Sequence, residues 1–373
     1  MKISDLKVIM PVIKACIFES KIVEEYGEIH FLSDLVCVFN DECIVQYPCQ
    51  TKINEEFSIN FSSFEKVFSK LRDDATFEVV NGKLLIKSGN TRIKLKLKQC
   101  GLISLKKRLE KIPSPKTKLG NPYHFDFFNS LGLCVTALVP FGSLSQPFNS
   151  YLYYSDGQMI GCSSFRAVKK SFKVINGKSL SSFIISGDSA TVLTKTWDAL
   201  NEEDISGGRP VLFEINKDFL VFRFFGIITV TISNGYGIVE YPMEKINRIF
   251  SMKGTIINYP DKKELLNIID MVSLFPKEFE DTTERISQSF DNKGIKIFSR
   301  NSGGSIKHRC YLKQKVFNGC FSFQAKDFKV ALEKICSNEK EKINIELCGE
   351  KHSAFIFNGN KCRYVIAATK EIV

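Results

Sequence analysis

Residue types that carry catalysis or hold metals occur in this chain of 373 residues, but their spacing does not bring them together. Glu202, Glu203 and Asp204 are typical of a solvated surface cluster rather than of a general acid and base pair. Ser302–Ser305 is a hairpin signal, and neither a P-loop nor a G-x-G-x-x-G run occurs. No H-E-x-x-H motif includes any of the four histidines, which are His30, His124, His308 and His352. The sequence therefore predicts no catalysis, no cofactor and no metal site.

The twelve cysteines include no C-x-x-C pair. Cys37, Cys43 and Cys49 are evenly spaced, which favours one strand face or a loop over the paired knuckles of a zinc site. Others lie in apolar runs, such as Cys16, Cys134 and Cys336. We expect these thiols to be small core residues in a reducing cytoplasm.

Basic residues outnumber acidic ones, with 52 Lys and Arg against 41 Asp and Glu. The resulting net charge of +11 suits a polyanionic partner such as nucleic acid, although a solvated basic face would give the same composition. Most of the surplus lies in the first and last thirds of the chain. No run of eighteen apolar residues occurs, so no membrane span is expected. Lys14 interrupts the apolar stretch Val8–Phe18, which we interpret as a helix rather than a signal peptide.

The elements that must position any functional residues follow a repeated order. In the first copy, Phe64, Phe68 and Leu71 form one apolar helical stripe, which predicts a helix over 62–72. A three-stranded meander follows it, with Asn81-Gly82 as its first hairpin turn. The same order recurs after the helical stripes Leu193, Trp197, Leu200 and Phe328, Leu332, Ile335, and the third copy has Asn358-Gly359 as its predicted turn.

Each copy is preceded by another helix and three strands. The leading helices are expected at Leu6–Phe18, Asp126–Val139 and Lys262–Phe275. The sequence thus predicts an α+β protein with three similar domains, each made of two helix-plus-antiparallel-sheet halves. The predicted boundaries are 1–120, 121–258 and 259–373, and the linkers are expected at Lys106–Asn121 and Met252–Pro260.

Several segments carry a resemblance to a known family. They are Ile86–Ile93, Pro147–Tyr154, Gly161–Ala167, Gly237–Pro242, Phe321–Phe328 and Tyr364–Ile366. In this order and spacing, the whole chain resembles a bacterial-type DNA sliding clamp, the beta subunit of DNA polymerase III.

The chain departs from that family at three points. Arg166 is the one clear match in the second-domain loop motif, where Cys162–Phe165 replaces the usual residues. Ala367–Val373 stands in place of the family's Met-Pro-Met-Arg-Leu ending. The chain is also basic, whereas cellular clamps are usually acidic. These differences indicate a divergent clamp, of cellular or phage origin, with an altered peptide pocket.

The resemblance implies a cytoplasmic, non-enzymatic processivity factor in a bacterial cell or phage-infected host. It implies a head-to-tail homodimeric ring around double-stranded DNA, bound without sequence preference. Recurring lysines on the sides of the helices opposite the apolar stripes support a basic inner wall. The candidate DNA-binding residues are Lys14, Lys66, Lys70, Arg72, Lys195, Lys262, Lys326, Lys329 and Lys334.

The resemblance also implies that a DNA polymerase and a clamp loader insert short peptides into an apolar groove. Its wall is expected to include Cys162, Ser164, Arg166, Ala167, Pro242, Ile246, Val365 and Ala367. The dimer contact is expected to join Ile93 and Leu95 of one chain to Leu274 and Phe275 of another. Two alternatives remain open: a monomeric clamp-like factor that grips DNA by charge, and a basic β-rich structural protein without a DNA role.

Overall fold

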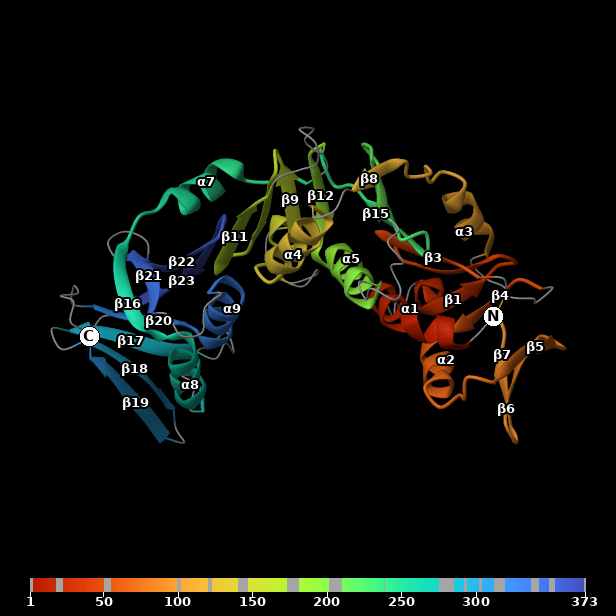
Figure 1. The fold of residues 1–373 in the computed structure, drawn as a ribbon, viewed down its shortest axis with the longest axis horizontal. Coiled ribbons are helices and arrows are strands. Elements are labelled where there is room, and N and C mark those ends of the chain that lie inside the picture. Colours follow the sequence, from red (N-terminus) through yellow and green to blue (C-terminus); the bar gives the residue numbers. More distant parts are fainter. Residues whose placement is uncertain are drawn as a thin grey trace. The chain divides into compact units, whose positions relative to one another are not determined.

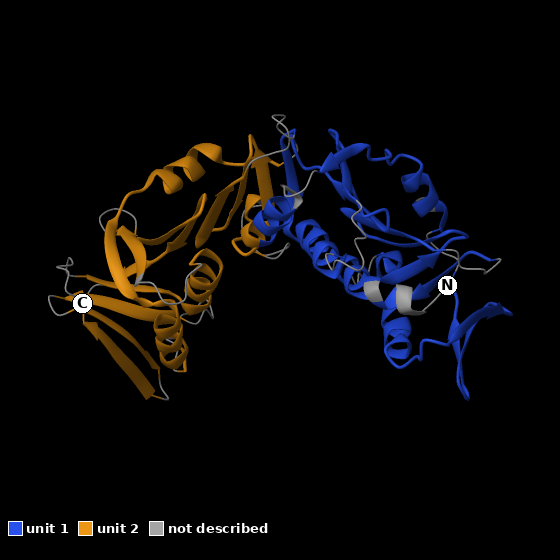
Figure 2. Cartoon of the chain, in the orientation of Figure 1, with its two compact units in different colours: residues 1–132, 173–238 blue, residues 133–172, 239–373 orange. Residues whose placement is uncertain are grey.

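The chain forms two compact units in the computed structural model (Figure 1, Figure 2). One unit comprises residues 1–132 and 173–238, and the other comprises residues 133–172 and 239–373. Each unit therefore joins segments that are far apart in the sequence. The structure describes residues 3–17, 23–49, 55–98, 102–119, 123–139, 147–172, 181–200, 210–237, 239–274, 285–291, 294–301, 304–311, 319–336, 342–348 and 353–371.

The first unit combines a large antiparallel sheet, a small one and several helices. Its helical elements are α1 (Ile3–Cys16), a 3-10 turn η1 (Glu24–Gly27), α2 (Phe61–Phe68), α3 (Leu102–Leu109) and α5 (Gly187–Leu200). Its strands are β1 (Glu28–Phe31), β2 (Leu35–Phe39), β3 (Cys43–Pro48), β4 (Phe57–Asn60), β5 (Thr76–Val80), β6 (Lys83–Ser88), β7 (Thr91–Lys96), β8 (Thr117–Leu119), β12 (Phe183–Ser186), β13 (Val211–Ile215), β14 (Phe219–Phe224) and β15 (Ile228–Ser233). The helix α4 (Tyr123–Val135) runs from the first unit into the second.

The large sheet of the first unit has the strand order β4-β1-β2-β3-β15-β14-β13-β8. Its centre pairs β3 with β15, so that Cys43 lies opposite Ile232 and Gln46 opposite Thr229. The ring of Phe128 in α4 stacks on Trp197 in α5 with 4.8 Å between ring centroids. This aromatic contact fixes α4 against α5 in the core beneath the sheet.

The small sheet of the first unit has the order β5-β6-β7. Asn81 and Gly82 both have positive φ, at 50° and 67°, as a tight two-residue hairpin with the right twist requires. Leu84 and Ile86 of β6 are buried. The ring centroids of Phe77 in β5 and Phe64 in α2 are 6.5 Å apart. The predicted meander is therefore confirmed, and one of its faces packs toward α2.

The second unit also has a large and a small antiparallel sheet. Its helical elements are η2 (Pro147–Ser150), α7 (Met243–Ser251), α8 (Lys262–Val272) and α9 (Ala325–Ile335). Its large sheet includes the run β9-β10-β11-β23-β22-β21-β16, and its other sheet has the order β19-β18-β17-β20-β24. These strands are β9 (Tyr151–Ser155), β10 (Gln158–Cys162), β11 (Arg166–Ser171), β16 (Thr255–Asp261), β17 (Arg285–Asp291), β18 (Gly294–Asn301), β19 (Gly304–Tyr311), β20 (Gly319–Gln324), β21 (Lys342–Cys348), β22 (Ala354–Gly359), β23 (Cys362–Ala367) and β24 (Thr369–Glu371).

The predicted repetition is present in the order of the elements. The series α1-β1-β2-β3, α4-β9-β10-β11 and α8-β17-β18-β19 form the three leading halves, and each trailing half contains α2, α5 or α9 followed by three strands. A strand that the sequence reasoning did not separate, β4, β12 or β20, leads directly into each trailing helix. The mixed α+β class with antiparallel sheets is confirmed, whereas the three domain boundaries stay a prediction.

Several predicted boundaries are wrong in detail. The helix predicted over 62–72 ends at Phe68, because the last turn tightens: the N–H groups of Lys70 and Leu71 bond to carbonyls only three residues back. Asn358 and Gly359 belong to β22, since Gly359 pairs with Cys362, and the turn there is formed by the next two residues. The linker segments also contain regular structure, namely α3, β8 and β16.

Among the described residues, no helix is both long and apolar enough to cross a membrane.

Candidate functional site

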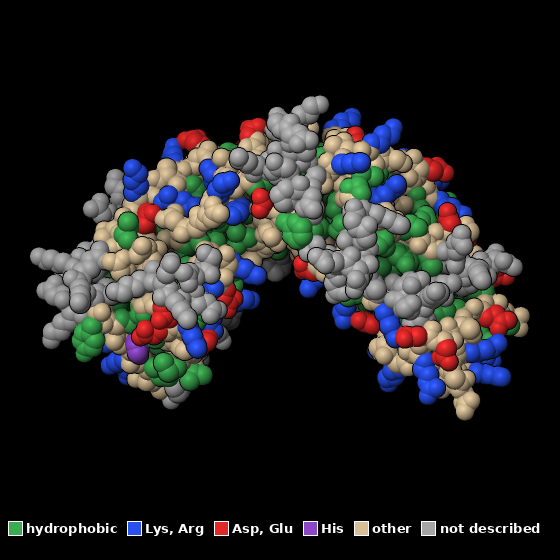
Figure 3. All heavy atoms as spheres, viewed as in Figure 1, with side chains coloured by type: hydrophobic (Ala, Val, Ile, Leu, Met, Phe, Trp, Pro, Cys, Tyr) green, Lys and Arg blue, Asp and Glu red, His purple; other side chains and the backbone are tan. Residues whose placement is uncertain are grey.

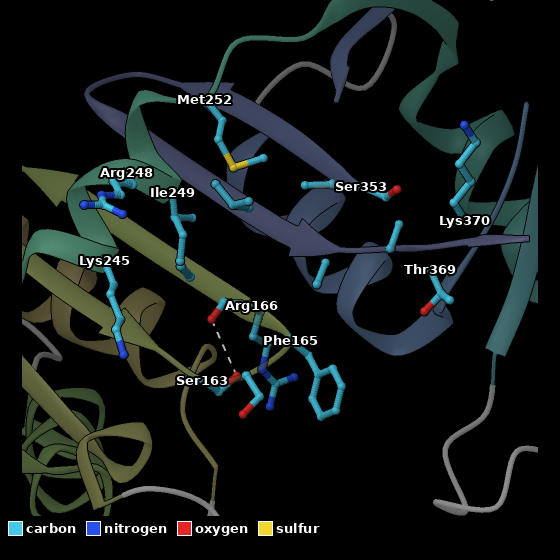
Figure 4. A pocket seen from close by; sticks show the side chains of 16 residues that line it. Ser163, Phe165, Arg166, Lys245, Arg248, Ile249, Met252, Ser353, Thr369 and Lys370 are labelled. Atoms are coloured by element: carbon cyan, nitrogen blue, oxygen red, sulfur yellow. Dashed lines mark hydrogen bonds between the residues drawn. The ribbon is translucent and has the colours of Figure 1, made fainter. Parts of the chain in front are cut away.

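A cavity of about 670 Å³ opens on the second unit, between α7 and the strands β11 and β23 (Figure 4). Its lining combines small apolar side chains from the strands with Ile249 of α7 and Met252, the residue directly after this helix (Figure 4). The residues that line it are Ser163, Ser164, Phe165, Arg166, Ala167, Lys245, Arg248, Ile249, Met252, Ser353, Ala354, Val365, Ala367, Ala368, Thr369 and Lys370.

The floor of the cavity is built by strand pairing. Ala167 of β11 lies opposite Val365 of β23, and Ala367 of β23 lies opposite Ala354 of β22. Residues directly opposite each other in a sheet project from the same face, so these side chains form one apolar surface. Because three of the four are alanines, the floor leaves room for larger side chains from a ligand.

A hydrophobic cluster joins this floor to α7. Cys162, Ile246 and Phe250 are buried in it together with Ala167 and Val365. Ile246, Ile249 and Phe250 recur at the spacing of one helical face, which directs the apolar side of α7 onto β11 and β23. The wall of the cavity is therefore part of a packed core rather than a loose surface loop.

Cys162 does not have the chemistry of a nucleophile in this cluster. Burial raises the pKa of its thiol to about 11, so the thiolate is scarce near neutral pH. Its Sγ atom lies 3.5 Å from the hydroxyl of Tyr241, and that hydroxyl donates a 3.2 Å hydrogen bond to the carbonyl of Ile160. The thiol thus acts as a small core group next to an anchored tyrosine.

Arg166 ties three segments of the second unit together at one end of the cavity. Its guanidinium forms an ion pair with Asp327 in the first turn of α9 and donates a 2.9 Å hydrogen bond to the carbonyl of Leu138. Burial raises the pKa of Asp327 above its ordinary value, and the neighbouring guanidinium opposes that shift. Because Arg166 is already paired, its main role in this structure is to hold the cavity wall in place.

Cations at the edge of the cavity remain accessible. Lys245 and Arg248 lie on the exposed side of α7, and Lys370 lies on the last strand, β24. Arg248 also pairs with Glu244 one turn earlier, where both side chains are highly exposed. Such a pair is weak in water, so it does not commit the guanidinium. The cavity therefore presents an apolar floor beside a basic edge.

The structure brings together most of the predicted groove residues. Ser164, Arg166, Ala167, Val365 and Ala367 line the cavity directly. The other three lie around it: Cys162 and Ile246 are in the supporting cluster, and Pro242 is the residue before α7.

Sequence reasoning missed the residues that α7 and the residue directly after it contribute to the cavity, namely Lys245, Arg248, Ile249 and Met252. A signal was present in the sequence, because Ile246, Ile249 and Phe250 have the spacing of an amphipathic helix. This short helix follows a proline-containing segment and lies outside the repeated halves, so the repeat pattern does not reveal it.

The candidate DNA-binding residues differ in how free they are. Lys66 in α2, Lys195 in α5, and Lys326 and Lys334 in α9 are exposed, as are Lys70 and Arg72 just after α2. In contrast, Lys14 pairs with Glu65 at 2.9 Å, and Lys329 pairs with Asp270. Lys262 is half-buried and donates a 2.9 Å hydrogen bond to the carbonyl of Cys336, just beyond the end of α9. The helices therefore carry fewer uncommitted cations than the sequence predicted, and the DNA-binding role of the nine residues stays a prediction.

Other cations of the first unit lie on a strand face. In Figure 3, Lys and Arg side chains gather at the end of the unit where Figure 1 labels β5, β6 and β7. Exposed cations alternate along two of these strands, at Lys83, Lys87, Arg92, Lys94 and Lys96.

The predicted dimer residues lie at positions that suit a contact between chains. Ile93 and Leu95 are half-buried on β7, which is an edge strand of its sheet, and Leu274 follows α8 with 69% of its surface exposed. Phe275 lies outside the described residues.

Within the described ranges, no group of three or more His, Cys, Asp or Glu side chains is placed to hold a metal ion.

Comparison with known proteins gives a clear result for the fold. No known protein family profile matches the sequence, and no curated protein is similar to it. Solved structures do match along nearly the whole chain. The DNA polymerase III beta subunit of Thermotoga maritima has 12% sequence identity and a TM-score of 0.78, and the match covers 100% of this chain and 99% of that one. The DNA polymerase III beta chain of Streptococcus pneumoniae has 14% sequence identity and a TM-score of 0.74, and the match covers 99% of this chain and 97% of that one.

A third match is the DNA polymerase sliding clamp of Bacillus subtilis, with 15% identity, a TM-score of 0.72 and 100% and 98% of the two chains covered. The chain therefore has the fold of DNA polymerase III beta subunits over its full length. The resemblance drawn from the sequence is confirmed at the level of the fold, and the low identity agrees with a divergent sequence.

Proposed function

We propose that this protein is a DNA sliding clamp, a processivity factor that encircles duplex DNA as a head-to-tail dimeric ring. The observation that carries the proposal is the shared fold, which covers 99% to 100% of the chain against structures described as beta subunits or sliding clamps. In this role the protein acts as a tether and has no catalytic step. We place it in the cytoplasm of a bacterial cell or a phage-infected host.

DNA binding in this proposal rests on the exposed lysines of the helices. Lys66, Lys195, Lys326 and Lys334 are exposed and lie on the three trailing helices α2, α5 and α9, which occupy matching places in the repeated order. Contacts from lysine to phosphate carry no sequence information, so the bound ring is free to slide. Enclosure rather than affinity would hold the protein on DNA, which tolerates weak and salt-screened contacts.

The cavity beside α7 is the proposed site for short peptides of the DNA polymerase and the clamp loader. Its small floor residues, Ala167, Ala354 and Ala367, leave space for one or two aliphatic or aromatic anchors. Such anchors supply most of the affinity in peptide grooves of this size.

Ring closure is proposed to join edge strands of two chains. The strand β7 is an edge of the sheet β5-β6-β7, and β19 is an edge of the sheet that also contains β17, β18, β20 and β24. Pairing such edges would cover backbone groups that otherwise invite aggregation. We propose that Ile93 and Leu95 pack against Leu274 and Phe275 of the second chain, and that each chain contributes the three domains 1–120, 121–258 and 259–373.

The decisive experiment measures topology on DNA. The full-length protein, loaded onto nicked circular DNA, should co-elute with the DNA and be released when a restriction enzyme cuts the circle. Sedimentation velocity should show a species of about twice the 42.3 kDa chain mass.

A pair of charge variants locates the contact. Replacing Lys66, Lys70 and Lys334 with Glu should reduce retention on the circle at least tenfold without changing the sedimentation coefficient. The matched control replaces three exposed lysines of turns and loops with Glu, namely Lys217, Lys253 and Lys361. It should keep most of its retention on circular DNA. Equal retention on circular and linear DNA would favour the alternative of a monomeric factor that grips by charge, and no retention on either would favour a structural protein.

A further inference from the structure

A second basic surface lies in the other unit, on the strands β18 and β19. Ile295, Ile297 and Ser299 of β18 are buried, and the hydroxyl of Ser299 bonds to the carbonyl of Val272 in α8. Because side chains alternate along a strand, the residues between them, Lys296, Phe298 and Arg300, project from the opposite face of the sheet. This outer face is turned away from the helices.

The pairing of β18 with β19 adds residues to the same face. Lys296 lies opposite Arg309, Phe298 opposite Lys307, and Gly294 opposite Tyr311. Opposite residues share a face, so two neighbouring strands present four cations and two aromatic rings together. We call this set of residues the β18–β19 face, and it consists of Lys296, Phe298, Arg300, Lys307, Arg309 and Tyr311.

The aromatic side chains of this face are accessible for stacking. Tyr311 has 81% of its surface exposed, which is unusual for a large aromatic ring with no local packing role. Phe298 is half-buried, and the Nζ atom of Lys296 lies 5.2 Å from the centre of its ring. Both rings therefore lie beside cations on a strand face rather than in the core.

The cations of this face are mostly uncommitted. Arg309 pairs with Asp291 of β17 at 3.0 Å, but Lys296, Arg300 and Lys307 form no ion pair with the described residues. A groove of about 520 Å³ runs beside them, lined by residues that include Lys296, Phe298, Arg300 and Lys307. Alternate residues of a strand are spaced about 6.6 Å apart, so the cations form a row along the groove.

We propose that the β18–β19 face binds single-stranded nucleic acid, with the phosphates along the cations and bases stacked on Phe298 and Tyr311. A basic groove with aromatic platforms is the combination that holds a single strand, because unpaired bases expose the ring faces that a duplex hides. The duplex-binding proposal uses helix lysines instead, so the two surfaces are separate. This inference does not depend on ring formation.

The first unit offers a matched surface that lacks the aromatic component. The outer face of β5, β6 and β7 carries Lys83, Lys87, Arg92, Lys94 and Lys96, while its remaining members are Thr76, Glu78, Val80 and Leu85. It has five cations against four on the β18–β19 face, but no ring on which a base could stack. It therefore separates the effect of charge from the effect of stacking.

The experiment measures fluorescence anisotropy of labelled oligo(dT) with the full-length protein, and of labelled oligo(rU) in parallel. Replacing Lys296, Arg300 and Lys307 with Glu should weaken binding at least tenfold. Tyr311→Ala leaves the charge unchanged and should weaken binding roughly fivefold or more, whereas Tyr311→Phe should bind as the unchanged protein does. Binding of either strand type with this dependence on the ring at position 311 supports the proposal.

The control variant replaces Lys83 and Lys87 of the central strand β6 and the exposed Lys217 with Glu, which makes the same change in net charge and leaves the edge strand β7 intact. It should lose less than twofold in affinity for oligo(dT). The proposal is overturned if this control loses as much as the β18–β19 variant, if Tyr311→Ala binds normally, or if unlabelled duplex DNA competes as well as oligo(dT). Because Tyr311 is exposed, its variants should keep the thermal midpoint of the unchanged protein. Failure here would leave the test on circular DNA unaffected.

Discussion

At the scale of single residues, His30 shows how burial sets a charge state. The ring lies in β1, its Nδ1 atom is 2.7 Å from the hydroxyl of Ser58, and its side chain is fully buried. Burial lowers the pKa of His30 to about 4, from an ordinary value near 6.5. The histidine is therefore neutral at physiological pH and acts as a core residue.

This burial predicts a pH dependence of stability. The folded protein binds a proton at His30 less readily than the unfolded chain, so the unfolded chain takes up more protons between pH 6.5 and 4. The contribution of neutral His30 to the free energy of unfolding is fully present above pH 6.5. It is lost as the pH falls toward 4, by up to about 3 kcal/mol. Urea unfolding at a series of pH values should show this slope. The His30→Gln variant should flatten this slope, and the control variant His308→Gln should keep it. An unchanged slope in His30→Gln would contradict the assignment of the pH dependence to His30.

The cysteines lie in the core as the sequence predicted, although Cys37 and Cys43 lie on two different strands, β2 and β3, and not on one strand face or loop. Every described cysteine is buried except the half-buried Cys336, and burial raises the pKa of thiols such as Cys310 and Cys362 to about 11. Apolar neighbours in the sequence were a sufficient signal, because a small thiol among Ile, Val and Phe is most stable inside a core.

At the scale of elements, periodicity identified the long helices and most strands but missed short or irregular ones. The six predicted helices have apolar stripes that pack on a sheet, as Phe64 and Phe68 of α2 do. In contrast, β16 contains Pro260 and buries only alternate residues, Ile257 and Tyr259, so its sequence looks like a linker. Its strand conformation comes from pairing with β21, a contact between distant segments that local patterns do not reveal.

Close packing between α4 and β10 predicts the effect of one methyl group. A Cβ atom at Gly161 would lie 2.2 Å from the carbonyl oxygen of Cys134, so the strand and the helix end would have to separate. We expect Gly161→Ala to lower the free energy of unfolding by about 1–3 kcal/mol. Gly27→Ala is the control, because no atom lies within 4 Å of its added Cβ, and its free energy should change little. Chemical denaturation measures both, and equal stability of the two variants would argue against this contact.

At the scale of the whole molecule, the charge distribution bears on how two chains would meet. Both edge strands that we propose to join are cationic: β7 carries Arg92, Lys94 and Lys96, and β19 carries Lys307 and Arg309. Like charges on adjacent strands repel each other. Closure of the proposed dimer is therefore opposed by electrostatics and must depend on packing and backbone hydrogen bonds.

This repulsion predicts that added salt strengthens the dimer. Two or three like-charge contacts of about 0.5 kcal/mol each correspond to roughly a tenfold change in Kd, and salt screens them. Sedimentation velocity in 50 mM and 500 mM NaCl should show the fraction of dimer rising with salt. The variant Lys94→Glu with Lys96→Glu should lose or reverse this trend. A dimer that dissociates as salt rises would contradict the proposed pairing of edges.

The candidate pocket shows where the sequence was informative at this scale and where it was not. Positions on regular strands, such as Ala167 and Val365, could be placed because the repeated order fixes which strand they occupy. The contribution of α7 and the pairing of Arg166 with Asp327 could not be predicted, because both depend on contacts between distant segments. Arg166 and Asp327, for example, are 161 residues apart in the sequence. The concentration of cations on the strand faces was also hidden, since it follows from the register of two strands.

The pairing of β11 with β23 has a consequence for how the protein is made. Arg166 of β11 lies opposite Ile366 of β23, so the partner strand of β11 leaves the ribosome about 200 residues later. During synthesis the edge of β11 must wait unpaired while about half of the chain is still being translated, which slows maturation and exposes that edge to wrong partners. The nascent protein should therefore depend on chaperones until β23 emerges, and a premature stop codon before β23 would prevent the second unit from completing its sheet.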